Sequence, residues 1–404
     1  MRILLFCFLP LWAVLLVDSG LKLFLLGVRL WRRPDQQGKA EAPTSPPHFL
    51  SFALLIPAHN EEGVIGETVR QLRALHYPSA QFAVIVIADG CTDLTARQAR
   101  ENGASCVLWA EQTGRKGRAL SRFLALERER LNAFDVMVVC DADTRLHADA
   151  LLFLNQAFLS GMQVGQGRVV SDPQSPSPLG ALMALSEALS QEVDDFARKA
   201  LGWPVPLRGT GMAFRREILQ GFGVLPHTRA EDMELSLLLC LYRVPVTFVP
   251  EAIVYDPKPT DVSAATKQRA RWFQGHWAVM RQYWQDILTV LRKGNVGERA
   301  LICSLLLRPR TLFIGVKATV LLGCFFLTAG LSPGILLFVG TGASFALLAD
   351  LIYYLIGSAL LTGRDNRRAL WRFALYLPIW LGAMVLSVFS TKRWLRVRDR
   401  GVER

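Results

Sequence analysis

Cysteine is scarce in this sequence, and its spacing matches no common zinc-binding motif. Only seven of the 404 residues are cysteines, and neither a Cys-x-x-Cys pair nor a Cys/His cluster occurs. This absence excludes the usual structural zinc domains. Several cysteines lie in apolar runs, where a free cysteine behaves as a small hydrophobic residue. The distribution therefore favours a main domain that faces the reducing cytosol.

The sequence also lacks internal repeats and a continuous basic stripe of the kind that binds nucleic acid. Positive charge nevertheless predominates, because 46 lysines and arginines against 34 acidic residues give a formal net charge of +12. Many basic residues flank apolar segments, at positions 29–33, 364–368 and 392–400. Such placement is typical of anchoring at a membrane surface. We therefore predict no nucleic-acid partner.

Long apolar segments at both ends of the chain predict an integral membrane protein, in the cell or inner membrane of a bacterium. Residues 3–30 are almost continuously apolar, which is longer than the core of a secretory signal. Because crossing a bilayer takes about twenty residues, this run predicts a retained transmembrane helix over 1–31. A second transmembrane region, 309–390, contains three candidate helices at 311–330, 334–361 and 370–390. A basic tail, 391–404, follows it.

The positions of the basic residues also predict which side of the membrane the main domain faces. The cluster after the first helix places 31–300 in the cytoplasm, and the charged loop 363–368 then lies inside as well. A third C-terminal crossing would place the basic tail outside, against the same rule. Three explanations stay open: 370–390 does not cross fully, 334–361 contains a break, or the tail is an exception.

Residues 48–275 predict an α/β domain with a mainly parallel sheet. Apolar runs typical of buried strands occur at 52–57, 82–88 and 134–140, with a shorter candidate at 106–109. Helical patterns alternate with them, near 61–75, 93–102, 115–131 and 147–160, and indicate helices on both faces of the sheet. The preceding segment 32–47 is predicted to be a linker, and 276–308 to form amphipathic helices at the membrane interface.

Two carboxylates, Asp141 and Asp143, stand where the apolar run 134–140 ends. Residues two apart on an extended chain point to the same side. Together they can hold a hard divalent cation, Mg²⁺ or Mn²⁺, against a diphosphate. The alternative is a solvated loop, in which aspartate is common. The position at a strand end favours the metal, since ligands of parallel sheets bind beyond the carboxyl ends of strands.

Other polar motifs stand at predicted strand ends or helix starts. Asp89 follows the second strand and can accept hydrogen bonds from a base or ribose, whereas Asp93 is placed to cap the next helix. Lys116 lies in a Gly-flanked basic turn that opens a helix, a position suited to phosphate, although a solvated basic loop is an alternative.

The second half of the domain adds three candidates. Gly209, Thr210 and Gly211 allow close approach of the backbone to a ligand. Glu231 and Asp232 begin an apolar helix, either as dipole-stabilising acids or as a base for an acceptor hydroxyl. The third candidate comprises Gln268, Arg271 and Trp272, at the start of a Trp-rich amphipathic stretch. This stretch is either an interfacial helix or an acceptor and diphosphate site.

Taken together and in this order, the motifs resemble inverting family 2 glycosyltransferases. The resemblance is to the membrane-bound branch that contains chitin-oligosaccharide, hyaluronan, cellulose and poly-N-acetylglucosamine synthases, and it covers about residues 52–275. It is carried by Asp89-Gly90, Lys116-Gly117, Asp141-Ala142-Asp143, Glu231-Asp232, Gln268 with Arg271 and Trp272, and the stretch Pro57, Ala58, His59, Asn60 and Glu61.

The resemblance implies a GT-A nucleotide-sugar-binding fold, a donor that is usually a UDP-sugar, and a metal that is Mg²⁺ or Mn²⁺. It implies that Asp232 is the general base and that Asp141 and Asp143 bind diphosphate and metal. Asp89 would read uracil, and the remaining donor-binding residues would be Pro57, His59, Glu61 and Lys116. The acceptor and diphosphate site would contain Gly209, Thr210, Gly211, Glu231, Gln268, Arg271 and Trp272.

These residues predict an inverting hexosyltransferase that forms β linkages, and the acceptor stays open between two classes. The first expectation is a growing polysaccharide, because the motif of Gln268, Arg271 and Trp272 occurs in processive relatives. The alternative is a single transfer to a lipid, because about four membrane helices are few for a channel. A third possibility is a non-catalytic subunit that works with other subunits of an export complex. The presence of Asp141, Asp143 and Asp232 disfavours it.

Overall fold

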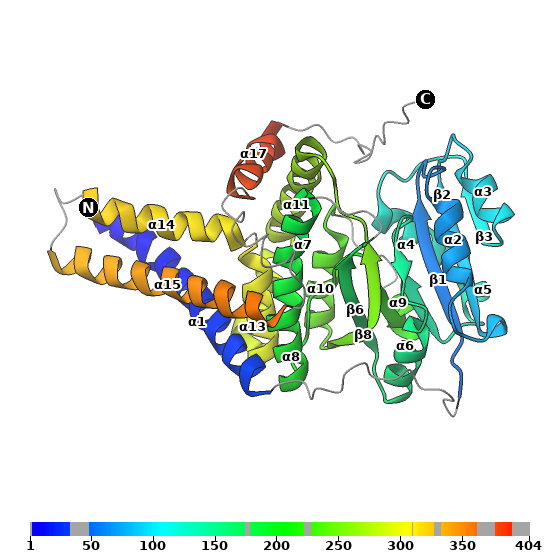
Figure 1. Cartoon of the computed structure of the whole chain (residues 1–404), viewed down its shortest axis with the longest axis horizontal. Coiled ribbons are helices and arrows are strands. Elements are labelled where there is room, and N and C mark those ends of the chain that lie inside the picture. The colour runs from blue at the N-terminus through cyan, green and yellow to red at the C-terminus, as the bar shows by residue number, and fades with distance from the viewer. Residues whose placement is uncertain are drawn as a thin grey trace.

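The computed structural model describes residues 2–32, 48–173, 178–221, 228–308, 310–326, 333–361 and 376–389. Nearly all of the predicted linker 32–47, the charged loop 363–368 and the basic tail 391–404 lie outside the described residues. The sheet domain occupies one end of the molecule and the long apolar helices occupy the other (Figure 1). A group of helices that includes α7, α10, α11 and α13 lies between them.

The sheet has eight strands in the order β3-β2-β1-β4-β7-β6-β8-β5. Its first half is parallel and contains the four predicted strands: β1 (Phe52–Ala58), β2 (Phe82–Asp89), β3 (Ser105–Trp109) and β4 (Val136–Val139). The second half contains strands that were not predicted: β5 (Arg145–Leu146), β6 (Val164–Ser171), β7 (Met212–Arg215) and β8 (Val246–Asp256). In that half β6 and β8 are parallel, and β7 runs antiparallel to both β4 and β6. The expectation of a mainly parallel α/β sheet is confirmed.

Alternation along each buried strand supplies two hydrophobic cores, one on each face of the sheet. Leu54 and Ile56 of β1 point to one face, whereas Ala53 and Leu55 point to the other. The first face packs against α2 (Ile65–Arg73) and α6 (Ala150–Leu159). The second packs against α4 (Lys116–Leu126), which α5 (Arg128–Leu131) continues. The short helices η1 (Ser79–Gln81) and α3 (Thr95–Glu101) complete this half. Helices therefore cover both faces, as predicted.

The middle layer of helices belongs to the second half of the chain. Between β6 and β7 lie α7 (Pro178–Leu189), the π-helical segment η2 (Ser190–Asp195) and α8 (Phe196–Leu201). After β7 come α9 (Arg216–Gly221) and α10 (Glu231–Leu241), and after β8 come α11 (Val262–Gln282), α12 (Trp284–Lys293) and α13 (Val296–Leu306). A third hydrophobic cluster joins α10 to α12 and α13, with Met233, Ile287 and Leu301 among its members. This packing fixes the start of α10 relative to α11.

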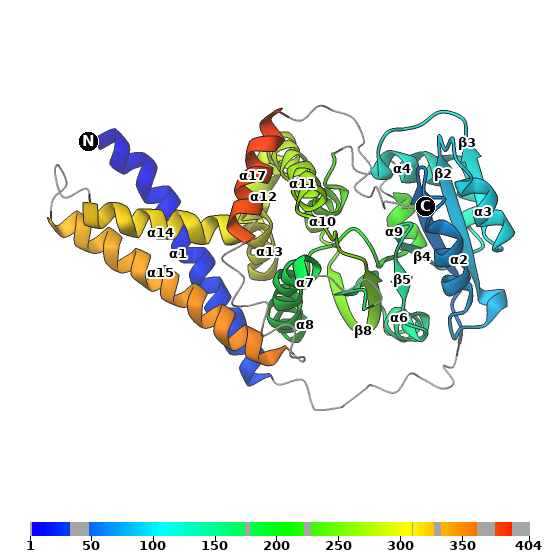
Figure 2. The same cartoon turned by 45° about the horizontal axis from the view of Figure 1, so that its top comes forward.

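Four apolar helices form the remainder: α1 (Arg2–Trp31), α14 (Arg310–Phe326), α15 (Pro333–Leu360) and α17 (Tyr376–Phe389). The first three cross one another as a bundle beyond the middle layer (Figures 1 and 2). Helix α17 instead packs along α11, where Gln274 Nε2 donates to the carbonyl oxygen of Ser387 at 2.9 Å. Over the described residues, one stretch is both long and apolar enough to cross a membrane, Leu336–Leu360.

A charged cluster is buried in this bundle, and we call Asp18, Lys22, Lys317 and Asp350 the buried charge cluster. Lys22 Nζ lies 2.6 Å from a carboxylate oxygen of Asp18 and 2.7 Å from one of Asp350. Lys317 Nζ lies 3.1 Å and 2.8 Å from oxygens of the same two residues. The two lysines and two aspartates balance formally. Because they come from α1, α14 and α15, they tie the three helices together.

Candidate active site

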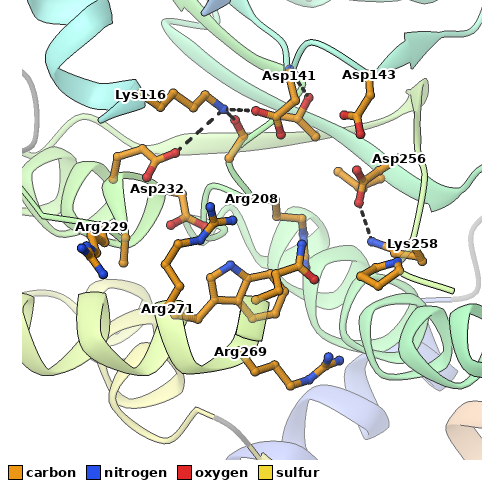
Figure 3. A pocket seen from close by; sticks show the side chains of 18 of the residues that line it. Lys116, Asp141, Asp143, Arg208, Arg229, Asp232, Asp256, Lys258, Arg269 and Arg271 are labelled. Atoms are coloured by element: carbon orange, nitrogen blue, oxygen red, sulfur yellow. Dashed lines mark hydrogen bonds and ion pairs between the residues drawn. The ribbon is translucent and has the colours of Figure 1, made fainter. Parts of the chain in front are cut away.

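An open cavity of about 890 Å³ lies between the carboxyl ends of the central strands and the helices of the middle layer. All of the residues predicted for the site line it, except Asp89 and Gly211. One wall comes from the turns after β1 and β4 and from the start of α4, and the opposite wall comes from α11 and α7 (Figure 3). The fold thus brings together motifs that are up to 215 residues apart, from Pro57 to Trp272.

Lys116 connects the two halves of the cavity. Its Nζ lies 2.5 Å from Asp141 Oδ1, 2.6 Å from the carbonyl oxygen of Gly209 and 3.8 Å from Glu231 Oε1 (Figure 3). Burial alone would lower the pKa of this ammonium, but the carboxylates of Asp141 and Glu231 raise it well above its ordinary value. A permanently charged lysine beside the turn after β4 is suited to bind a phosphate group.

The two carboxylates after β4 both face the cavity (Figure 3). The backbone N–H of Asp141 donates to Thr210 Oγ1 at 3.2 Å, which holds this turn against the loop before β7. Among the described residues, no cluster of three or more His, Cys, Asp or Glu side chains is placed to hold a metal. A pair of carboxylates still fits Mg²⁺ or Mn²⁺, which commonly takes one or two of them and completes its shell with phosphate oxygens and water.

The turns after β1 and β2 hold each other in place. His59 Nδ1 lies 2.7 Å from the carbonyl oxygen of Asp89, and Asn60 adopts a left-handed φ of 55°. The Asp89 carboxylate is buried and accepts hydrogen bonds from the backbone N–H and hydroxyl of Thr113, both at 2.8 Å. It therefore positions the loop before α4, and its predicted contact with a base stays a prediction.

Asp93 lies two residues before α3, whose N-cap residue is Leu94 without a side-chain cap, so the structure does not place Asp93 at the predicted cap position. Its carboxylate accepts from the backbone N–H of Thr95 at 3.0 Å.

The glycines of the predicted close-approach motif adopt backbone conformations that favour glycine. Gly209 and Gly211 have φ of 85° and 62°. A Cβ on Gly211 would lie 2.4 Å from Val254 Cγ2, so this residue allows the loop to pack on β8. Gly209 and Thr210 line the cavity, whereas Gly211 does not.

Glu231 and Asp232 form the first turn of α10, and both line the cavity. Burial, reinforced by the neighbouring Asp232, raises the pKa of Glu231 to about 7, although Lys116 opposes the shift. Burial also raises the pKa of Asp232, against the effect of a hydrogen bond from the Met233 N–H and of the Arg308 charge. A carboxylate whose pKa is raised is suited to take up a proton near neutral pH, as a general base does.

Helix α11 presents Gln268, Arg271 and Trp272 to the cavity, as Figure 3 shows for Arg271. The approach of this helix to the acid pair depends on Gly275, because a Cβ there would lie 2.6 Å from the backbone nitrogen of Ala230. Gln268 Oε1 is buried without a hydrogen-bond partner among the described residues. Because buried acceptors are normally satisfied, this oxygen is available to accept a hydrogen bond from a ligand.

Several charged residues of the cavity were not predicted. Lys258 Nζ lies 2.7 Å from Asp256 Oδ2 at the end of β8 (Figure 3). It also pairs with Glu187. The same rule of polar residues at strand ends would have found Asp256, had β8 been recognised as a strand. Other cationic residues of the cavity stand at positions without a motif of their own, and they include Arg208, Arg229, Arg308 and Arg310.

The profile of the family described as "Glycosyltransferase like family 2" matches residues 46–275. The chain belongs to this family. Its sequence is 29% identical over 299 residues to the β-monoglucosyldiacylglycerol synthase of Trichormus variabilis, which covers 71% of this chain and 60% of that protein. It is 27% identical over 260 residues to a probable glycosyltransferase of Bacillus subtilis, covering 61% of this chain and 60% of that one. The chain thus spans about 60% of the length of these curated relatives.

Among solved structures, the glycosyltransferase is similar to the mannosyltransferase PcManGT from Pyrobaculum calidifontis, which was crystallised with GDP-Man and Mn²⁺. The TM-score is 0.54 and the identity 20%, with 94% of this chain and 99% of that one covered. This likeness confirms the GT-A fold. The family and the enzyme class are confirmed as well. The finer placement in the polysaccharide-synthase branch is not supported, because the curated relatives include synthases of glucosyldiacylglycerol.

Proposed function

We propose that this glycosyltransferase transfers a single sugar from a nucleotide-sugar to a hydroxyl group of a membrane lipid. One observation carries the proposal. The cavity that contains Asp141 and Asp232 is also lined by Leu305, Arg308 and Arg310, where the chain passes from α13 into the apolar α14. A lipid headgroup at the membrane surface could therefore reach the acid pair. The glucosyldiacylglycerol synthases among its relatives support the same acceptor class.

The proposed reaction is one in-line displacement. Asp232 takes the proton of the acceptor hydroxyl, whose oxygen forms a bond to the anomeric carbon as the bond to the diphosphate oxygen breaks. Lys116 and Arg271 bind the diphosphate that leaves. A divalent cation would be held by Asp141 and Asp143 and would supply neutralising charge to the diphosphate. A single displacement inverts the anomeric centre, so an α-linked donor gives a β-glycoside.

We further propose that the protein is integral to the membrane and that its catalytic domain faces the cytosol. The bundle of α1, α14 and α15 is the membrane-embedded part in this proposal, and α17 lies beside it against the catalytic domain. The contact between α17 and α11 favours the explanation in which 370–390 does not cross fully. The closely packed bundle, with Trp12, Leu15 and Ala343 buried in its interior, favours a lipid product over a threaded polysaccharide.

The expected product is a lipid that carries one additional sugar. Full-length enzyme in lipid nanodiscs should convert diacylglycerol when it is supplied with the correct member of a panel of UDP-sugars and GDP-mannose. Mass spectrometry of the extracted lipid reads the product directly. A ladder of masses spaced by one hexose would instead establish polymer synthesis. Failure of every donor to turn over, with diacylglycerol and with anionic phospholipid alike, would favour the non-catalytic alternative.

Removal of divalent metal should abolish transfer, and Mg²⁺ or Mn²⁺ should restore it. An Asp143→Asn variant should need more metal, because one of two carboxylate ligands is replaced by a neutral amide. Metal titrations of the transfer rate measure both effects. Asp149→Asn, which changes an aspartate outside the cavity, is the matched control. Undiminished activity in EDTA would contradict the proposed metal site.

A further inference from the structure

Three arginines converge on the side of the cavity nearest the apolar bundle. Arg310 pairs with Asp194 of η2 and donates to the hydroxyl of Tyr353 at 2.7 Å. Arg208 pairs with Asp195 and lies 3.8 Å from Glu187. Arg308 differs from both, because it forms neither an ion pair nor a hydrogen bond with any residue in the described part of the chain. Its charge still acts on Asp232, Asp195 and Glu187, but over the described residues no carboxylate lies within ion-pair distance of it.

The same group of arginines contains a hydrogen-bond donor that has no acceptor in the part of the chain that the structure describes. The Nε–H of Arg208 is buried and has no hydrogen-bond partner among the described residues. Burial, and then the charges of Arg208 and Arg310, lower the pKa of Arg308 to about 10, although Asp232 and Asp195 oppose the shift, so the three guanidinium groups repel one another. Buried donors are nearly always satisfied in folded proteins. The unpaired Nε–H of Arg208, in the cavity that the half-buried Arg308 also lines, thus indicates a place for an anion that the described residues do not supply.

The position of Arg308 relates this place to the acceptor. Arg308 stands between α13 and α14, and its charge lowers the pKa of Asp232 against the larger effect of burial. Apolar side chains also line the cavity, among them Met183, Met233 and Leu305. A cation at the start of an apolar helix lies at the level of lipid headgroups.

The donor diphosphate is a less suitable occupant. The proposed reaction already places that group against Lys116, Arg271 and the turn after β4, and Lys116 directly contacts Asp141. An anion at Arg308 would instead sit beside the general base. A general base is needed only where a hydroxyl attacks. The acceptor would then carry a hydroxyl at Asp232 and an anionic group a short distance away.

We propose that Arg308, together with the Nε–H of Arg208, forms a subsite for the phosphate of an acceptor phospholipid whose headgroup also carries the reacting hydroxyl. This inference rests on the proposed transfer to a lipid and narrows its acceptor from lipids in general to anionic glycerophospholipids. Arginine suits the role, because its planar group can donate two hydrogen bonds to one phosphate.

The test compares acceptors in phosphatidylcholine nanodiscs that contain either phosphatidylglycerol or diacylglycerol. Arg308→Gln should raise the KM for phosphatidylglycerol by about ten- to a hundred-fold, the loss of hydrogen bonds to a charged group. The KM for the nucleotide-sugar should stay unchanged. Because Arg308 lowers the pKa of Asp232, its loss also raises that pKa, and the resulting change in turnover should be equal for the two acceptors. Arg308→Lys should recover part of the loss, since it keeps the charge. Arg299→Gln removes a charge from an exposed arginine of α13 and is the matched control.

A second measurement, of lipid binding, gives an outcome that does not depend on turnover. Phosphatidic acid has the phosphate without a headgroup alcohol, so it should compete with acceptor in the wild type and lose this effect in Arg308→Gln. Free inorganic phosphate should not compete. A raised donor KM in the variant, competition by free phosphate alone, or competition that does not depend on Arg308 would each overturn the inference.

Failure of the proposed function has a different signature. In that case no lipid receives sugar. Native mass spectrometry can still measure whether phosphatidic acid displaces bound phosphatidylglycerol from the wild-type protein. A third outcome is that sugar is transferred to diacylglycerol while the binding of phosphatidic acid does not depend on Arg308. This outcome would leave the proposed function intact and overturn only the phosphate subsite.

Discussion

Replacement of Asp232 by asparagine is expected to lower the rate of sugar transfer by about 10²–10⁴-fold, the usual contribution of a general base. The amide cannot accept the proton of the acceptor hydroxyl, but it keeps the size of the side chain at the first turn of α10. Donor binding should survive, because Lys116 and the turn after β4 lie on other elements. Initial transfer rates and calorimetric titration with the nucleotide-sugar measure the two effects separately.

Glu231→Gln separates the base from its neighbour. Activity should rise with pH as the acid pair loses its proton, with an apparent pKa set by the pair, and burial places the pKa of Glu231 at about 7. Removing the Glu231 carboxylate removes a like charge. The pKa of Asp232 should therefore fall, and the inflection should move to lower pH while substantial activity remains. Asp286→Asn, outside the cavity, is the control. Full activity of Asp232→Asn would assign the proton transfer to another group.

The first half of the sheet could be predicted because its strands are continuous apolar runs that end in polar residues. β1, β2 and β4 follow this pattern, and the strand-end rule led directly to Asp141 and Asp143. The second half breaks the pattern. Strand β6 contains Gly165, Gln166 and Gly167, a stretch that reads as a loop. Gly167 is required there because a Cβ would lie 2.6 Å from the carbonyl oxygen of Ala252.

Burial of Gln166 shows why local patterns fail in this region. Its Oε1 accepts from the backbone N–H of Arg208 at 2.9 Å, and its Nε2 donates to the carbonyl oxygen of Thr210 at 3.0 Å. The side chain thus shapes the loop that carries the glycine motif. A polar residue in a strand that hydrogen-bonds to a loop 42 residues later has no signature in its own neighbourhood.

The cations of the cavity escaped prediction for a related reason. Arg208, Lys258 and Arg308 belong to a loop, a strand end and a helix junction, and no spacing connects them. Their function depends on which carboxylates the fold places beside them. Only the structure shows that Arg208 and Lys258 form ion pairs and that Arg308 forms none with the part of the chain that is described.

The buried charge cluster gives the second large expected effect. Lys317→Leu leaves Asp18 and Asp350 with a single lysine in an apolar bundle, so the cluster carries an uncompensated negative charge. Breaking a buried ion pair by removing one partner typically destabilises a protein by about 3–5 kcal/mol. The free energy of unfolding of the full chain in detergent should therefore fall by that order. Donor binding should persist below the transition, because the strand ends lie outside the bundle.

The double variant Lys317→Leu with Asp350→Leu decides whether uncompensated charge causes the loss. It removes one positive and one negative group together, leaves Lys22 paired with Asp18, and replaces the lost pair with apolar side chains. If unpaired charge is the cause, the double variant should be more stable than Lys317→Leu, which is coupling of the sign expected for direct partners. Thr319→Leu, on the exposed side of α14, controls for the added apolar volume. Additive losses in the double variant would show that the lysine stabilises the bundle by packing rather than by charge. The balanced charges would then have to be explained by selection of one helix register. If the bundle lies in the membrane, as proposed, ionisable groups on its helices are expected to face the interior, and this requirement fixes the register.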